Sequence, residues 1–304
     1  MRIKKNKIIV SLVVIIVTGA FFYFQIPSSP IYKVDGDTLI YSSNRPTPQF
    51  ERTLFSENES FNIYKINFVT RPFGNSQSRI YGFLVVPKSA QKSPGIVLLP
   101  GGGGTKEGEL RLASIIAKES YTVLTIDQRG IGQTGGEIIS HDKDLQLFLN
   151  GKESQQHLMI YDVLASFDVL KSQKEVDTNN IVVIGESMGA RYGMVAGVLE
   201  PEIKGVLAIS SSGYNVPRDL TSPQRRYYAS IDPDHYLSKL SPRHLVILHA
   251  QNDSVVPIIS AQTTFQKARE PKKFFLTNAS NCNHGYCDAM HENLKEGLKF
   301  IFEK

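Results

Sequence analysis

A serine between two glycines is the residue of this sequence best placed for nucleophilic chemistry. Ser187 is the central residue of G-E-S-M-G (185–189), which follows the apolar run 181–184 and precedes a stretch rich in small residues. Between a strand and a helix, G-x-S-x-G forms a tight turn that raises the serine hydroxyl above the end of the strand. The pattern therefore predicts Ser187 as a nucleophile, with a helix-capping serine as the alternative.

A serine hydroxyl needs a base that takes its proton and an acid that orients the base. Asp253 follows the apolar run 245–248, and His284 follows the run 274–276 just before the last helical stretch. Each lies where the chain leaves a strand, and the order Ser, Asp, His along the chain is one in which such triads occur. Asp232 and Asp234 are rival acids, but neither follows a strand. We therefore predict Asp253 as the acid and His284 as the base.

A glycine run predicts the group that would stabilise a developing oxyanion. P-G-G-G-G (100–104) follows the apolar run 96–99. Glycines let backbone N–H groups approach a ligand, so we predict the amides of Met188 and Gly102 as the two donors of an oxyanion hole. A phosphate-binding loop is the alternative, but no Lys-Ser or Lys-Thr pair follows the glycines.

Short apolar runs alternate with amphipathic stretches over residues 61–304 and predict one domain. Continuous apolar runs are typical of strands buried on both faces of a parallel sheet, and here they occupy residues 96–99, 122–126, 181–184, 206–209, 245–248 and 274–276. Residues 61–70 and 79–86 have the spacing of an antiparallel hairpin, whereas 154–171 and 288–302 have helical spacing. This order predicts an α/β fold with a mostly parallel central sheet and helices on both faces.

Two proline-containing segments interrupt or precede this alternation. Residues 211–241 contain three prolines, with a fourth directly after them at position 242, and they predict a small cap insertion above the sheet. Residues 27–60 contain prolines among Ser, Asn and Asp, and they predict a linker followed by an irregular segment that leads into the domain.

The amino-terminal residues predict a membrane signal. Residues 8–26 contain no charged side chain and follow the basic stretch MRIKKNK. A helix of this length spans about 28 Å, near the thickness of the hydrocarbon core of a bilayer. Residues 1–26 are therefore predicted to form one transmembrane helix that acts as a signal anchor, with a cleaved signal peptide as the alternative. We expect a single-pass protein of the cell membrane with its domain outside the cytoplasm, or a secreted protein.

The charge distribution excludes nucleic acid as a partner. Arg2, Lys4, Lys5 and Lys7 supply four units of the net charge of +5, and no acidic residue precedes Asp35. The rest of the chain is nearly neutral, so it lacks the basic surface that nucleic acids require.

The two cysteines of the chain, Cys282 and Cys287, flank His284. In a domain outside the cytoplasm this spacing predicts a disulfide, with free thiols as the alternative. Two thiols and one histidine do not complete a zinc site, and the sequence contains no H-E-x-x-H motif. We therefore expect no metal.

Together, these motifs resemble those of the α/β-hydrolase superfamily over residues 61–304. The matching segments are P-G-G-G-G (100–104), D-Q-R-G-I-G (127–132), G-E-S-M-G (185–189), N-D (252–253) and N-H-G (283–285). The D-x-R-G-x-G segment is similar to a turn in serine esterases, dienelactone-hydrolase-like enzymes and serine aminopeptidase-like members. The resemblance implies acyl transfer to water without a cofactor, but the superfamily does not fix the acyl group.

We expect a carboxylic ester as the substrate, with a peptide bond as the alternative, so that the partner is a small-molecule ester or a peptide. A peptidase would usually bring an acidic pair for a free amino terminus or an added propeller domain, and neither is clear in the sequence. A non-catalytic binding protein of the same fold is a third possibility, but such a protein would usually lack one member of the triad.

Overall fold

The computed structural model describes residues 32–73, 76–88, 91–216 and 220–303. The predicted membrane segment, residues 1–26, lies outside the described residues, as do residues 27–31 of the predicted linker. Within the described ranges, no helix is both long enough and apolar enough to cross a bilayer.

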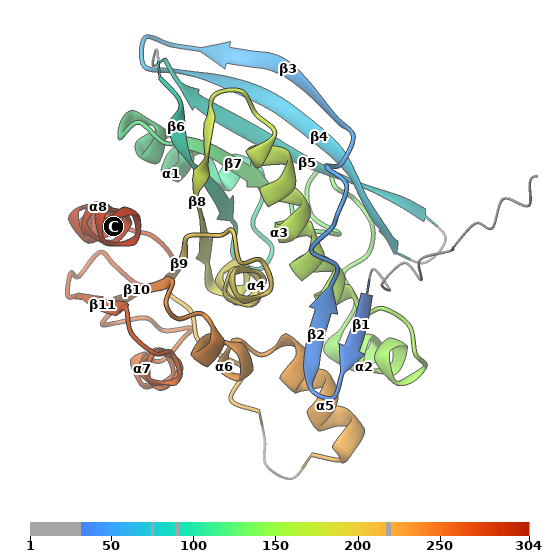
Figure 1. The fold of residues 1–304 in the computed structure, drawn as a ribbon. Helices are drawn as coiled ribbons and strands as arrows, with labels where there is room; N and C mark the ends of the chain where they lie inside the picture. Colours follow the sequence, from blue (N-terminus) through green and yellow to red (C-terminus); the bar gives the residue numbers. More distant parts are fainter. Residues whose placement is uncertain (1–31, 74–75, 89–90, 217–219, 304) are drawn as a thin grey trace, which may run out of the picture.

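A twisted sheet forms the centre of the molecule, with the strand order β11-β10-β9-β8-β6-β7-β5-β4-β3 (Figure 1). Six neighbouring strands are parallel, and three further strands continue the sheet in antiparallel pairing. The parallel strands are β6 (Ser93–Leu99), β7 (Thr122–Ile126), β8 (Val176–Glu186), β9 (Gly205–Ile209), β10 (His244–Ala250) and β11 (Lys272–Thr277). The antiparallel strands are β3 (Phe50–Glu57), β4 (Phe61–Phe73) and β5 (Ser76–Pro87). The mostly parallel sheet is confirmed, and the expected hairpin is present as β4 and β5, whose strands are longer than predicted.

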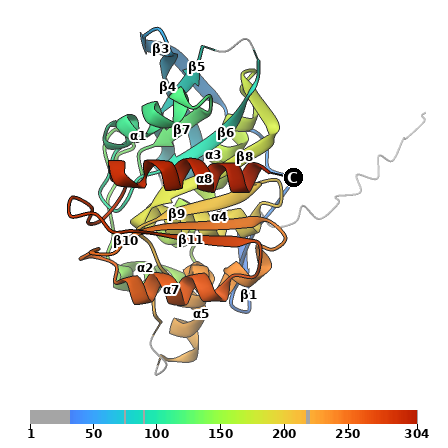
Figure 2. The same cartoon turned by 90° about the vertical axis from the view of Figure 1, so that its left-hand side faces the viewer.

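Helices cover both faces of the sheet. On one face, α1 (Lys106–Lys118) and α8 (His291–Phe302) lie against the strands, and on the other face lie α3 (Gln155–Lys171) and α4 (Ser187–Leu199) (Figure 1). A further helix, α7 (Ile258–Lys267), lies on the opposite side of β10 and β11 from α8 (Figure 2). α1 and α3 each follow a residue whose side chain accepts a backbone hydrogen bond, Thr105 before α1 and Ser154 before α3.

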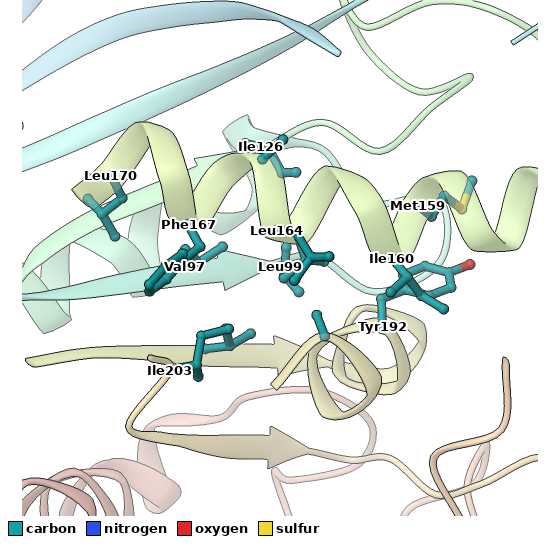
Figure 3. Packing of buried hydrophobic residues seen from close by; sticks show 14 of the residues in the cluster. Val97, Leu99, Ile126, Met159, Ile160, Leu164, Phe167, Leu170, Tyr192 and Ile203 are labelled. Carbon is teal, nitrogen blue, oxygen red and sulfur yellow. The ribbon is translucent and has the colours of Figure 1, made fainter. Parts of the chain in front are cut away.

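The core between α3 and the sheet is formed by aliphatic and aromatic side chains. Leu164 and Phe167 of α3 pack among Val97 and Leu99 of β6 (Figure 3), and all four are at most 2% exposed. Burying one such side chain contributes about 1.5–3 kcal/mol. This packing fixes the ends of β6 and β8, from which the predicted site extends.

The prediction of an irregular segment before residue 60 is wrong for residues 32–41 and 50–57, whereas residues 42–49 form no regular element. β1 (Tyr32–Asp35) and β2 (Thr38–Tyr41) form an antiparallel hairpin, and β3 pairs with β4 at the edge of the main sheet. Distant contacts stabilise this region: Leu39 is fully buried, and Arg45 binds both Asp168 and Glu200. Pro46 and Pro48 lie between β2 and β3, where they interrupt no strand, whereas Pro27 and Pro30 lie outside the described residues.

The insertion at 211–241 folds into short helices between β9 and β10, namely α5 (Ser222–Ile231), α6 (Pro233–Tyr236) and the 3₁₀ helix η1 (Leu237–Lys239). It packs against the amino-terminal hairpin, because Tyr236 Oη accepts the Leu39 N–H at 2.7 Å and Arg226 donates to the carbonyl of Val34. The Tyr227 hydroxyl donates to Asp144 of α2 (His141–Leu149). The hairpin therefore supports the insertion. The remaining element is the 3₁₀ helix η2 (Asp288–Met290), directly before α8.

Candidate active site

Ser187 lies on a strained turn between β8 and α4. It is the first residue of α4 and follows the last residue of β8 directly, and its φ of +48° falls in the left-handed region that side chains other than glycine rarely adopt. A Cβ at Gly185 would lie 2.5 Å from the backbone nitrogen of Ala190, and a Cβ at Gly189 would lie 2.3 Å from the carbonyl oxygen of Pro100. Only glycine fits at both positions, so the expected elbow is present, with Ser187 half-exposed.

The glycine run after β6 lies directly beside this elbow. A Cβ at Gly101 would lie 3.4 Å from Ser187 Cβ, and one at Gly102 would lie 3.1 Å from Met188 Cε. The loop closes on itself through a hydrogen bond from Gly104 N–H to the carbonyl of Gly101. The structure thus brings the predicted donor residues Gly102 and Met188 into contact.

Asp253 and His284 are paired. They lie in the loops that follow β10 and β11, and both carboxylate oxygens of Asp253 are 3.0 Å from His284 Nδ1. The Asp253 side chain is fully buried, whereas that of His284 is 25% exposed. A partly exposed imidazole held by a buried carboxylate is the arrangement that a general base requires.

Hydrogen bonds keep Asp253 ionised. Burial alone would raise the pKa of Asp253, but bonds from the backbone N–H groups of Val256 and Val255 and from His284 outweigh it, so the pKa lies below its usual value. His249 Nε2–H donates to the carbonyl of Val256 at 3.0 Å and thereby fixes this turn. An ionised Asp253 holds the Nδ1–H form of His284, which leaves Nε2 free to accept a proton.

Ser187 and His284 are not joined directly. Within the described residues, no hydrogen bond links Ser187 Oγ to the imidazole, although such contacts often tighten only when substrate binds. The link between the two loops is Glu186, whose carboxylate accepts the N–H of Tyr286 at 3.2 Å. The structure therefore pairs two members of the predicted triad and places the third on a neighbouring loop.

Cys282 and Cys287 form a disulfide with a Cα–Cα distance of 5.6 Å. The six-residue ring that it closes contains His284, Gly285 and Tyr286. It restricts the loop that carries the predicted base. In the described part of the chain, no group of three or more His, Cys, Asp or Glu side chains could hold a metal ion.

Sequence reasoning missed Gln128, Glu186 and Glu109 around this site. Gln128 Nε2–H donates to the carbonyl of Pro100 at 2.7 Å, and Gln128 is one residue after Asp127 in the D-x-R-G-x-G segment. Glu186 occupies the first x of G-x-S-x-G, a position at which the motif specifies no residue type. Glu109, on α1, is buried. In the sequence, it is marked only as a charged residue among the apolar residues of one helix face. None of these residues has a spacing that would reveal its partner.

The fold with its serine elbow after β8 defines an α/β hydrolase, as expected from the motifs. A model of the acetyl xylan esterase (AXE1) family matches residues 41–232, more than half of the 304 residues, and the chain belongs to this family. The match includes the glycine run and Ser187 but ends before Asp253 and His284.

Solved structures and curated relatives are similar but distant. The acetyl xylan esterase from Paenibacillus sp. R4 has a TM-score of 0.66 and 17% identity, over 85% of this chain and 90% of that chain. The glucuronoyl esterase from Solibacter usitatus has a TM-score of 0.61 and 12% identity, over 88% and 90%. The uncharacterized protein YfhR of Escherichia coli (strain K12) is 22% identical over 197 residues. The chain spans 60% of the length of that relative.

Proposed function

We propose that this protein is a serine hydrolase that cleaves carboxylic esters through an acyl-enzyme. Ser187 Oγ attacks the ester carbonyl carbon while His284 Nε2 takes its proton, and the alcohol leaves with that proton. Water then attacks the acyl-enzyme, and the same imidazole transfers one proton from water to Ser187. Asp253 stabilises the imidazolium in both halves of the reaction.

The observation that carries the proposal is the pairing of exposed His284 with buried Asp253, beside a serine held on a turn of positive φ. The contact of the glycine run with Ser187 and Met188 supports the further assignment of the Gly102 and Met188 amides as oxyanion donors. Membership of the acetyl xylan esterase family supports esters as the substrate class. We propose an acetyl ester of a carbohydrate or other small alcohol as the substrate.

A fluorophosphonate probe tests the nucleophile. The wild-type protein should be labelled at Ser187, which peptide mass mapping locates, and Ser187→Ala should abolish both labelling and hydrolysis of p-nitrophenyl acetate. A folded wild-type protein that is neither labelled nor active would favour the non-catalytic binding protein. Aminoacyl and prolyl amides assayed beside acetylated xylo-oligosaccharides test the substrate, and hydrolysis of the amides alone would favour a peptidase.

We further propose that residues 1–26 anchor the protein in the cell membrane with the domain outside the cytoplasm. The uncharged run 8–26 and its basic flank support this location. A disulfide such as Cys282–Cys287 also suits an oxidising compartment. Membrane fractionation with carbonate extraction tests the anchor, and recovery of the mature protein in the medium would favour secretion.

A further inference from the structure

The Glu186 carboxylate lies between the serine elbow and the loop that carries His284. One oxygen, Oε1, accepts the Tyr286 N–H at 3.2 Å. The other lies against Gly285, where a Cβ would be 2.8 Å from Oε2. The backbone of Gly285 has a φ of +83°, which favours glycine and turns the chain toward the carboxylate. Glu186, which directly precedes Ser187, therefore contacts the two residues that follow His284.

We propose that Glu186 is a positioning residue that holds the base loop against the serine elbow and so sets the distance between Ser187 and His284. The inference rests on the proposed function, because it concerns the reaction of these two residues. Glu186 ends β8, whose strand is hydrogen-bonded to β6 and β9 on both sides, so its carboxylate is attached to a rigid element. The disulfide restricts the base loop internally, and Glu186 supplies the contact that fixes the loop relative to Ser187.

The charges around Glu186 make this contact sensitive to pH. The titratable groups that face it are Glu109 of α1 and His284 and Tyr286 of the base loop. The pKa of Glu186 lies above its usual value, because burial outweighs the Tyr286 N–H and His284, which lower it. Burial together with the nearby Glu186 raises the pKa of Glu109 to about 8. At neutral pH, a protonated Glu109 places no negative charge beside the Glu186 carboxylate that accepts the Tyr286 N–H.

Two ionised carboxylates would repel each other once Glu109 loses its proton. Tyr286 lies close to Arg111 and Asp288, but these two side chains form an ion pair with each other, so the positive charge of Arg111 is already paired. Above the pKa of Glu109, the contact with Tyr286 weakens and the base loop is held less firmly. We therefore expect the rate to fall on the alkaline side.

Replacement of Glu186 tests the proposal directly. Glu186→Ala removes the acceptor, whereas Glu186→Gln keeps an oxygen that can accept the Tyr286 N–H. Because a displacement of about 1 Å at a reacting group can cost about 10²-fold in rate, we expect Glu186→Ala to lower kcat for p-nitrophenyl acetate by about tenfold or more, with KM changed less than about twofold. Glu186→Gln should keep most of the neutral-pH rate. Each rate is divided by the concentration of active sites, which is measured by titration with a fluorophosphonate.

Glu200→Ala is the matched control. Glu200 is also buried and is paired with Arg45, but it lies at the far end of α4, about 19 Å along the helix from Ser187. This variant should lower the melting temperature and leave kcat per titrated site unchanged. A kcat for Glu186→Ala equal to that of the wild type would overturn the positioning role while the proposed function stands. A wild-type protein that is neither labelled nor active would instead refute the proposed function.

A second pair of measurements decides the matter if Glu186→Ala does not fold. The pH dependence of kcat is compared between the wild type and Glu109→Gln from about pH 6 to about pH 9.5. The wild-type rate should fall as the pH rises through the pKa of Glu109, about 8, and Glu109→Gln should lack this fall. Identical alkaline limbs in the two proteins would contradict the proposal.

Discussion

Replacement of Asp253 by asparagine removes the charge behind His284 while it keeps the shape of the side chain. In the wild-type protein, Oδ1 accepts the N–H groups of Val255 at 2.9 Å and Val256 at 2.8 Å, and both oxygens lie 3.0 Å from His284 Nδ1. Asparagine has one acceptor oxygen, which the two backbone amides retain. Its NH₂ group then faces His284, and the imidazole can accept this bond only as the Nε2–H tautomer, which has no lone pair for the serine proton.

The expected loss follows from this tautomer change. Loss of the acid from a Ser-His-Asp triad with its geometry intact costs about 10⁴-fold in kcat, which corresponds to about 5 kcal/mol of transition-state stabilisation. Asp232→Asn is a matched control, since Asp232 is also buried and its Oδ1 also accepts two backbone N–H groups, from Tyr214 and Asp234. No imidazole is bonded to Asp232 in the described residues, so its replacement should change kcat less than about threefold.

The assay is hydrolysis of p-nitrophenyl acetate at neutral pH, with a thermal melt of each variant to show that it is folded. Both variants alter a carboxylate that accepts backbone N–H groups, but only Asp253→Asn also removes the charge that is paired with His284. Comparing their rates therefore separates these two effects. A folded Asp253→Asn that keeps more than about one tenth of the wild-type kcat would refute the assignment of Asp253. An equal loss in Asp232→Asn would show that damage to a loop, rather than the charge behind His284, lowers the rate.

Three further changes test other parts of the site and the core. Gln128→Leu should lower kcat about tenfold or more, because it frees the carbonyl of Pro100 at the start of the proposed oxyanion loop, and an unchanged steady-state rate would contradict this role. Dithiothreitol should lower kcat of the wild type through the Cys282–Cys287 bond but leave the double serine variant unaffected; equal sensitivity would place the effect elsewhere. Burial lowers the pKa of His157 from 6.5 to about 3, so its contribution to stability is present above pH 6.5 and is lost as pH falls toward 3. The urea midpoint of His157→Gln should therefore fall less than that of the wild type between neutral and acidic pH.

The sequence predicted the positions of Ser187, Asp253 and His284 because each follows a strand with a strong apolar signal. Strands such as Ile181–Ile184 within β8 and Leu245–Leu248 within β10 are buried on both faces, so their side chains are apolar without interruption. Parallel strands place the residues that follow them at one edge of the sheet. The local sequence pattern was therefore enough to predict that Asp253 and His284 lie close together.

The strands before residue 60 had no such signal. β3 forms the edge of the sheet and is exposed over most of its length, so its sequence carries no apolar run. The structure around it depends on residues far along the chain, as in the ion pair of Arg52 with Glu175 and the bond of Leu39 with Tyr236. These partners are more than one hundred residues away, and no local pattern of residues 27–60 indicates them.

The proline at position 100 illustrates how the glycine run, the proposed oxyanion loop, is placed beside the serine elbow. Proline has no backbone N–H to donate, but its carbonyl oxygen is still available as an acceptor. The carbonyl of Pro100 accepts a hydrogen bond from Gln128, and its oxygen would lie 2.3 Å from a Cβ at Gly189. The backbones of β6 and α4 consequently meet at Pro100 and Gly189, and Gly101 lies against Ser187. Any side chain at Gly189 would separate the glycine run from the serine elbow. The requirement for glycine at 189 therefore arises as much from the loop at 100–104 as from the turn at Ser187.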